Sequence, residues 1–535
     1  MREEESIFLN SPARMGCLAL VCAGLATMAL FSSSSASAQT PILLESQKLL
    51  ASDATAWDDF GYSVAVSGDT AVVGAHTDSD NASSSGSAYV FRYDGSDWVE
   101  EAKLTASDGA AGDLFGFSVA VSGGTAVVGA GRDDDSGSSS GSAYVFRYNG
   151  SDWVEEAKLT ASDGAAFDWF GEQVAVSGDT AVVGAAGNDD SGGRSGSAYV
   201  FRYDGSDWVE EAKLTASDAA ISDGFGERVA VSGDTAVIGA SGDDDNGLSS
   251  GSAYIFRYDG TTWVEEAKLT ASDGATNHSF GISVAVSGDT AVVGASGDAF
   301  TGPAYVFRYD GSDWIEEAKL TASDGAAWDY FAFSVAVSGD TAVVGARHDD
   351  QFGSAYVFRY NGSDWVEEAK LTASDAAPSP SFGARLGISV AVSGDTAVVG
   401  ANGDDDNGPN SGASYVYALV TTTSVEIDIK PGSDPNSINP FSRGVVPVAI
   451  FGSEDFDVAG IDLTRLTLGI DDALPAIVGR RHSDVNADGF PDLILHFRIA
   501  ETGIEIGDTE VCLGGETLDG TPFSGCDTIR TVPDR

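Results

Sequence analysis

Short apolar runs separated by small polar turns recur along most of the chain. The stretch FGYSVAVSGDTAVVGA at 60–75 returns in six further close copies. In the second copy, the apolar runs that predict β-strands cover 117–122, 125–130, 142–148 and 152–162. Gly-Asp, Asp-Gly and Asn-Gly pairs join such runs, and these pairs favour the positive φ angles of hairpin turns. Each copy therefore predicts four antiparallel strands. The sequons at Asn149 and Asn361 lie in these turns, and we interpret them as turn residues rather than glycan sites.

The copies are marked by a Phe-Gly pair and a later Gly-Ala pair, spaced 55 or 51 residues apart. The first mark stands at Phe60, Phe115, Phe170, Phe225, Phe280 and Phe382, with Phe331-Ala332 as a variant. The second stands at Gly74, Gly129, Gly184, Gly239, Gly294, Gly345 and Gly400. Seven four-stranded units predict an all-β chain folded as a seven-bladed β-propeller.

The strand chemistry fits this radial arrangement. SVAV runs carry the small side chains that a crowded axis needs, while a Trp recurs on the outer strand of six copies. These are Trp98, Trp153, Trp208, Trp263, Trp314 and Trp365. We interpret them as packing between blades rather than as a ligand platform, because large aromatic side chains dominate core energetics.

The ends of the array predict how the ring closes. The last copy stops after its third strand at 411–420, and the leading segment LLESQKLLASD at 43–53 resembles the missing fourth strand. The N-terminal strand is therefore expected to complete the seventh blade and to remove the open sheet edges.

Composition changes at both ends of the repeats. Arg14, the apolar run at 15–31 and the ASA at 36–38 predict a signal peptide over 1–38. A membrane anchor is the alternative, but 17 residues are short for a span. The propeller is expected over 42–420, a linker over 420–424, and a small β-sandwich-like domain over 425–535. Cleavage of the signal leaves Cys512 and Cys526, which are expected to form a disulfide in an exported chain, with two buried thiols as the alternative.

The Phe-Gly mark, the SVAV strand and the Gly-Ala mark together resemble the FG-GAP repeat family over about 42–420. That resemblance implies the seven-bladed propeller of integrin alpha subunits and of many exported bacterial proteins. Integrin-type repeats often hold calcium between their first two strands, where this chain has the short turn SGDT. The copies therefore resemble the shortened, metal-free bacterial type of repeat, and the C-terminal segment resembles a module common at the ends of exported bacterial proteins.

The formal charge of −54 predicts no nucleic-acid partner, because phosphates would be repelled. It fits either divalent cation binding or a highly solvated surface in salty surroundings, and we favour the second for most of the charge. The runs Asp133–Asp135, Asp243–Asp245 and Asp404–Asp406 lack the alternating spacing of a calcium loop.

The strongest ligand motif is DVNADGFPD at 484–492. Asp484, Asn486 and Asp488 would point toward one centre, with the Phe490 carbonyl and Asp492 completing a calcium site. We expect a structural Ca²⁺ there; the alternative is an Asx-rich turn without metal.

Loops on one expected face of the propeller diverge between copies, whereas the turns of the other face are nearly uniform. The divergent face is expected to meet any partner, with drift of unconstrained loops as the alternative. Its candidate residues are Trp57, Asp58, Asp168, Trp169, Trp328, Asp329 and Tyr330.

No catalytic constellation stands out, since the G-x-S-x-G matches at 137–141 and 247–251 lie in hairpin loops. The sequence predicts a secreted, extracellular or cell-surface binding or adhesion scaffold for a protein or glycan partner, with the periplasm as another location. We expect a monomer with no membrane span after signal removal. A carbohydrate-active hydrolase or lyase propeller is the alternative, and it predicts acidic and aromatic side chains converging at the channel mouth.

Overall fold

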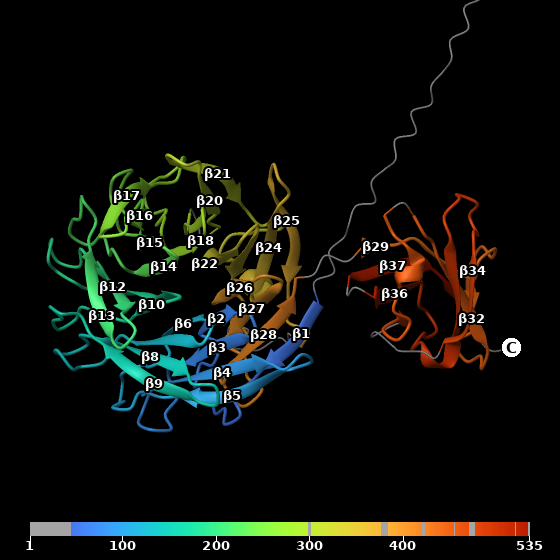
Figure 1. The fold of residues 1–535 in the computed structure, drawn as a ribbon, viewed down its shortest axis with the longest axis horizontal. Coiled ribbons are helices and arrows are strands. Elements are labelled where there is room, and N and C mark those ends of the chain that lie inside the picture. Colours follow the sequence, from blue (N-terminus) through green and yellow to red (C-terminus); the bar gives the residue numbers. More distant parts are fainter. Residues whose placement is uncertain are drawn as a thin grey trace, which may run out of the picture. The chain divides into compact units, whose positions relative to one another are not determined.

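The computed structural model describes residues 44–297, 301–375, 384–419, 423–453, 455–469, 477–518 and 521–532. The predicted signal peptide and Phe382 lie outside these ranges. Seven four-stranded antiparallel sheets surround a central channel (Figure 1). This arrangement confirms the seven-bladed β-propeller. No helix in the described ranges has the length and apolarity needed to cross a membrane.

Each blade is a meander whose strands pair in chain order, from the axis outward. The first three blades comprise β2 (Ser63–Ser67), β3 (Thr70–Ala75), β4 (Ser87–Tyr93) and β5 (Trp98–Leu104); β6 (Ser118–Ser122), β7 (Thr125–Ala130), β8 (Ser142–Tyr148) and β9 (Trp153–Leu159); β10 (Gln173–Ser177), β11 (Thr180–Ala185), β12 (Ser197–Tyr203) and β13 (Trp208–Leu214). The next three comprise β14 (Arg228–Ser232), β15 (Thr235–Ala240), β16 (Ser252–Tyr258) and β17 (Trp263–Leu269); β18 (Ser283–Ser287), β19 (Thr290–Gly294), β20 (Ala304–Tyr309) and β21 (Trp314–Leu320); β22 (Phe331–Ser338), β23 (Thr341–Ala346), β24 (Ser354–Tyr360) and β25 (Trp365–Leu371), with the 3-10 turn η2 (Asp349–Gln351).

The two glycine marks are contact points between neighbouring blades. A Cβ placed on Gly129 would lie 1.9 Å from the carbonyl oxygen of Gly171 in the next blade. Gly171 itself has a φ of 86°, and its N–H donates to the Gly184 carbonyl of its own blade at 3.0 Å. A side chain at Gly129 or Gly171 would collide with the neighbouring blade, so the glycine marks set the spacing of the ring. The sixth copy has Ala332 in place of the Phe-Gly glycine, and β22 has an irregular register there.

The seventh copy starts four residues later than the Phe-Gly pair at 382–383 indicates. Leu386 is 1% exposed and bridges Gly353, as Phe115 bridges Gly86 in an earlier blade. Gly387 donates its N–H to Gly400 in the manner of the other Phe-Gly glycines. Leu386-Gly387 therefore replaces Phe382 as the mark of this copy, because buried position and register select the equivalent residue.

The N-terminal strand closes the ring as predicted. β1 (Leu44–Leu49) pairs antiparallel with β28 (Ala413–Ala418), which continues to β27 (Thr396–Ala401) and β26 (Val390–Ser393). Glu45 accepts hydrogen bonds from the backbone and hydroxyl of Ser374 at 2.8 and 2.9 Å, as Glu155 does from Ser107 in the body of the array. The closing strand thus reproduces an ordinary blade-to-blade contact.

A β-bulge in the outer strands links the blades at the rim. The pairing of β8 with β9 skips Glu156, and this extra residue accepts from Arg147 within its blade and from the Trp208 indole of the next. Four of the six repeated tryptophans are at most 9% exposed. This geometry supports packing rather than ligand stacking as their role.

The C-terminal region forms a β-sandwich of its own. One sheet contains β29 (Thr423–Ser424), β37 (Pro522–Thr528), β36 (Glu510–Glu516) and β33 (Thr467–Gly469). The other contains β30 (Ile427–Ile429), β32 (Val445–Ile450), β35 (Asp492–Arg498) and β34 (Ile477–Ser483). The short strands β31 (Ser437–Ile438) and β38 (Arg530–Thr531) pair, and η3 (Val458–Gly460) and η4 (Ile499–Glu501) are single turns. Val448, Leu495 and Leu513 form its buried centre, and a disulfide joins Cys512 to Cys526 across β36 and β37.

Replacing Lys48 by Met should destabilise the closure. The Lys48 ammonium lies 2.6 Å from Asp375, 2.9 Å from Asp404 and 2.6 Å from Asp406, and Asp404 is 8% exposed. We expect a loss of about 2 kcal/mol in urea unfolding, because a buried carboxylate loses its counter-charge.

Lys103→Met is the matched control, since Lys103 makes the equivalent contacts inside a continuous blade. Limited proteolysis should release the N-terminal strand faster in Lys48→Met alone. Equal cleavage in both variants would mean that the backbone ladder holds the closing strand without help from Lys48.

Candidate functional site

The divergent loops lie side by side on one face of the propeller. Loops between the second and third strands of a blade hydrogen-bond to the connection that leads into the next blade. Examples are Phe167 N–H to the Ser138 carbonyl at 2.8 Å and Trp57 N–H to the Pro409 carbonyl at 2.8 Å. These two loop sets therefore form a continuous surface around the channel.

The seven candidate partner residues play different roles on this surface. Trp57 and Trp328 are 61% and 58% exposed. Asp58 and Asp168 are buried, and they accept the backbone N–H of Thr55 and Ala165 at 2.6 and 2.8 Å. Asp329 likewise accepts from Ala326 at 2.5 Å. These three aspartates thus hold the loops in shape, and the exposed members of the seven candidates are Trp57 and Trp328.

Three exposed rim aromatics occupy a backbone conformation that suits glycine. Trp57, Phe167 and Trp328 have φ angles of 73°, 71° and 77°, and Phe167 is 59% exposed. Gly112 holds the same place in the second copy with a φ of 90°, and a Cβ there would meet nothing within 4 Å. Large side chains held in this region store strain, which is typical of residues kept for binding.

The acidic loop clusters surround lysines. Lys158 lies 2.7 Å from Asp108 and 3.1 Å from Asp133, and it also pairs with Asp135. The Tyr144 hydroxyl donates to Asp108 and Asp133 at 2.8 and 3.0 Å. Equivalent lysines are Lys48, Lys103, Lys213, Lys268, Lys319 and Lys370. A metal ion at these clusters would have to compete with the ammonium group that already pairs with their carboxylates.

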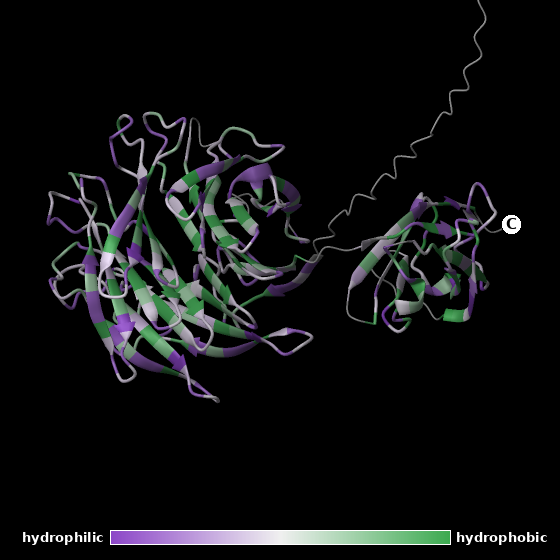
Figure 2. Ribbon diagram, turned by 45° about the horizontal axis from the view of Figure 1, so that its top comes forward, coloured by the Kyte–Doolittle hydropathy of each residue, from purple (hydrophilic) through white to green (hydrophobic). Residues whose placement is uncertain are grey.

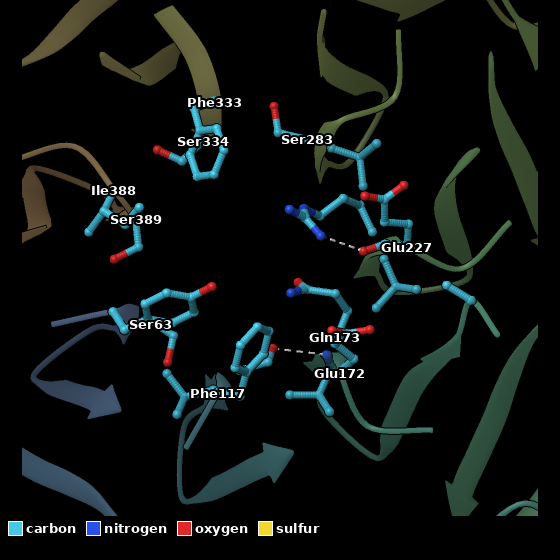
Figure 3. Close-up of a pocket in the computed structure, with 18 of the residues that line it drawn as sticks. Ser63, Phe117, Glu172, Gln173, Glu227, Ser283, Phe333, Ser334, Ile388 and Ser389 are labelled. Carbon is cyan, nitrogen blue, oxygen red and sulfur yellow. Dashed lines mark hydrogen bonds between the residues drawn. The ribbon is translucent and has the colours of Figure 1, made fainter. Parts of the chain in front are cut away.

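A cavity of about 560 Å³ opens at the channel mouth. Every blade contributes two residues near the start of its inner strand to the wall of this cavity: a Ser-Val, Gln-Val or Arg-Val pair. Figure 3 shows these side chains around a common opening. The residue that follows the Phe-Gly mark lies at the rim of this cavity in six blades. These residues are Tyr62, Phe117, Glu172, Glu227, Phe333 and Ile388.

The two halves of the mouth differ in chemistry. Blades three and four place Glu172, Gln173, Glu227 and Arg228 where the other blades place an apolar residue and a serine. Figure 3 shows Gln173 and Glu227 across the opening from Ile388 and Ser389. Tyr62 and Phe117 pack with ring centroids 4.8 Å apart in the apolar half. The cavity is therefore amphipathic.

Arginines outside the repeat pattern gather at this mouth. Six of the propeller's arginines recur on the third strands and pair with glutamates, whereas Arg132, Arg194 and Arg228 line the cavity. The guanidinium groups of Arg132 and Arg194 lie 5.4 and 4.8 Å from the Trp169 ring centre. Within the described ranges, neither has a carboxylate within 4.0 Å, although partly buried Glu172 interacts with both electrostatically. Both arginines are exposed and line the cavity.

A smaller cavity of about 180 Å³ adjoins the first through Phe333. Arg347 lines it and lies 3.7 Å from the Phe333 ring centre and 4.6 Å from that of Tyr330. Of the candidate partner residues, Trp169 thus lines the larger cavity and Tyr330 the smaller.

The protonation equilibria at the mouth follow from burial. Burial raises the pKa of Glu172, although nearby Arg132 and Arg228 partly oppose the shift. Burial also lowers the pKa of His76 to about 4, so His76 is a neutral imidazole against Tyr62 at physiological pH.

The predicted calcium loop of the sandwich domain is only partly assembled. Asp484 and Asp488 are exposed and accept the N–H groups of Gly489 and Phe490 at 3.2 and 2.8 Å. Asp492 is buried, and its two oxygens accept from Val485 and Gly452. Among the described residues, the acidic groups whose ligand atoms converge within 4.8 Å do not include this set. Side chains of the loop would have to move inward to hold an ion.

A model of the FG-GAP repeat matches seven segments that together cover more than half of the chain. The matched residues are 44–91, 98–146, 153–201, 208–256, 263–307, 314–358 and 365–417.

The chain belongs to the FG-GAP repeat family.

Other comparisons add little to this assignment. No curated protein matches the chain. A chain in the crystal structure of the mitotic checkpoint complex matches over 76% of this chain and 99% of its own length, at 12% identity and a TM-score of 0.42. A similarity at that level carries no functional argument. The FG-GAP propeller as a fold supports a scaffold or binding role in general.

Sequence reasoning missed the residues that make the channel mouth of this FG-GAP propeller distinctive. The signal was present, because the third and fourth copies read Glu-Gln and Glu-Arg after the Phe-Gly mark where the second reads Phe-Ser. A search for departures from the repeat, rather than for catalytic motifs, would have found them.

Two aspartates of the third blade should respond to pH in opposite ways. Burial opposes ionisation of Asp163, but hydrogen bonds from Lys213 and Tyr199 outweigh it and hold its pKa below the ordinary value of about 3.9. Burial raises the pKa of Asp168, with the Ala165 N–H partly offsetting the shift. Asp163 therefore stabilises the fold above pH ~4, and this stabilisation is lost as the pH falls through its lowered pKa. The charged form of Asp168 destabilises the fold at neutral pH, and protonation through its raised pKa removes this destabilisation.

We expect Asp163→Asn to lower the melting temperature at pH 7, and Asp168→Asn to leave it unchanged or higher. Any gain from Asp168→Asn should shrink as the pH falls through the raised pKa of Asp168. Melting curves between pH 3 and pH 8 test this, and a lower stability of Asp168→Asn at pH 7 would show that its carboxylate is needed in charged form.

Proposed function

We propose that this protein is an exported, non-catalytic binding or adhesion scaffold that engages a protein or glycan partner through the divergent loop face of its propeller. The observation that carries the proposal is the location of the residues that depart from the repeat. The inner strands and tight turns are nearly uniform between blades, while charged and large aromatic departures from the repeat lie on the divergent loop face and at its central cavity. Repeat scaffolds commonly present their binding residues on such a variable face.

The rim aromatics allow function to be separated from stability. Trp57→Gly and Phe167→Gly remove exposed aromatic side chains and relieve the positive φ at both positions. We expect folding stability to be kept or raised, because Gly112 occupies the equivalent place in another blade. Binding to an array of extracellular glycans and matrix proteins should fall at least about tenfold, as for aromatic hot spots.

The control is Ser206→Ala in a uniform turn on the opposite side of the blade, where Ser206 bonds only to Asp204 and Asp207 in its own turn. It should bind like the parent protein. If the double glycine variant kept full binding, the part of the rim around Trp57 and Phe167 would not be the partner surface.

A carbohydrate-active enzyme is the second candidate. Glu172 and Glu227 share one cavity with Tyr62, Phe117 and Phe333, which is the acidic and aromatic cluster that this alternative requires. Incubation with oligosaccharides separates the two functions: the scaffold returns its ligand intact, whereas an enzyme yields shortened products whose formation stops in Glu172→Gln.

The sandwich domain is proposed to bind a structural Ca²⁺ through Asp484, Asn486, Asp488 and the Phe490 carbonyl, with Asp492 anchoring the loop from inside. The full mature chain should then gain thermal stability in the sandwich transition when calcium replaces EDTA, because a ligand that binds only the folded state stabilises it. Asp488→Ala should abolish the gain, and Asp455→Ala, an exposed site outside the loop, should not. If the melting temperature of the sandwich transition is the same in calcium and in EDTA, the loop is an Asx turn without metal.

A further inference from the structure

Among the described residues, the arginines of the channel-mouth cavity lack the salt bridges that the repeated lysines and arginines make. The chain carries 82 acidic and 28 basic residues. The repeated lysines form ion pairs with the aspartate clusters, and the repeated arginines form ion pairs with the rim glutamates. Arg132 and Arg194 instead lie over the Trp169 ring and line the cavity, and Arg228 lines it from the inner strand. The cavity also holds Glu172 and Glu227, so its three arginines outnumber its two carboxylates in an otherwise acidic protein.

We propose that this cavity binds a sugar residue bearing an isolated carboxylate, such as a uronic acid within a short oligosaccharide. This inference rests on the proposed binding function and names the ligand class of its central site.

The arginine geometry favours a carboxylate. A guanidinium group presents parallel N–H donors that match the two oxygens of a carboxylate, and stacking on an indole orders it without using those donors. Two such groups share the Trp169 ring, at 5.4 and 4.8 Å from its centre. The donors are therefore oriented before a ligand arrives.

The remaining walls favour a sugar ring over a simple organic acid. A sugar has an apolar C–H face and a polar edge. The cavity offers Tyr62, Phe117 and Phe333 on its apolar side, and Glu172, Gln173 and Glu227 on its polar side as partners for hydroxyl groups. Its volume of about 560 Å³ lies within the usual range of ligand pockets, about 300–1,000 Å³.

Net charge limits how anionic the ligand can be. The formal charge of −54 repels a densely charged chain at long range, but screening confines this effect to about 8 Å at physiological ionic strength. A single carboxylate in contact with arginines escapes most of that repulsion, whereas a polysulfated chain extends along the acidic surface. The structure therefore favours sparse carboxylates over dense sulfates.

The test is calorimetric titration of the full mature chain with matched oligosaccharides: one containing glucuronic or galacturonic acid, its neutral glucose or galactose counterpart, and a sulfated counterpart. We expect the uronic ligand to bind at least about tenfold more tightly than the neutral one, as for hydrogen bonds to charged groups. Preference for the sulfated ligand, or equal binding of all three, would overturn the proposal.

The variant Arg132→Gln/Arg194→Gln should weaken uronic binding at least about tenfold and leave the neutral ligand nearly unchanged. Arg465→Gln removes the same charge from the sandwich domain, where Arg465 is exposed and pairs with Glu516, and should bind like the parent. Arg194→Lys tests the fork geometry, because it keeps the charge and should restore little of the affinity. Unchanged uronic binding in the double variant, confirmed as folded by its melting curve, would overturn the assignment of the site.

Failure here is separable from failure of the scaffold function. If Trp57→Gly/Phe167→Gly loses partner binding while the cavity ignores uronic ligands, the divergent face remains the binding surface and only the ligand class is wrong. If the Trp57→Gly/Phe167→Gly variant keeps partner binding and the cavity does not bind uronic ligands, both the rim surface and the ligand class are wrong.

Discussion

The fold depends on a close approach of glycine backbones between adjacent blades. At six of the seven blade contacts the Gly-Ala glycine of one blade meets a glycine of the next with no room for a Cβ, as Gly129 meets Gly171; at the remaining contact Gly294 meets Ala332. This spacing lets the fully buried second strand pack against its neighbour, so each blade buries its faces only when the next is present. Blade number and ring closure follow from repeating this contact until the N-terminal strand completes the last blade.

The charges of the repeat are arranged around that framework. In six of the seven blades an outer-strand lysine pairs with aspartates from two loops, and a tyrosine hydroxyl donates to one or two of the same carboxylates. In the fifth blade, Lys319 and Tyr305 pair with Asp273 alone among the described residues. At the rim, the bulge glutamate bridges an arginine of its own blade to a tryptophan of the next. These networks give many of the buried and half-buried carboxylates of the described blades a lysine, arginine or tyrosine partner within the repeat.

Function is best sought where the repeat is interrupted. Glu172, Gln173, Glu227 and Arg228 replace apolar and serine positions without disturbing the inner strands, and Arg132 and Arg194 enter from loops of neighbouring blades. Together they turn a channel of Ser and Val into an amphipathic cavity. The exposed aromatics of the rim, held at positive φ, surround the same face. Scaffold and site therefore occupy different sets of positions in the same repeat.

The sequence by itself determined the seven blades, the closing strand and the sandwich domain, because each depends on local periodicity or on similarity between copies. It also identified the divergent loops. Tertiary structure alone decided which residues share the channel mouth, since Tyr62, Glu172 and Phe333 meet only after the ring brings distant blades to one axis. It also decided that Asp58 and Asp168 turn inward to cap their loops, and that Leu386 rather than Phe382 marks the seventh copy. Burial and register select such residues, and both are properties of the packed ring rather than of any short stretch of chain.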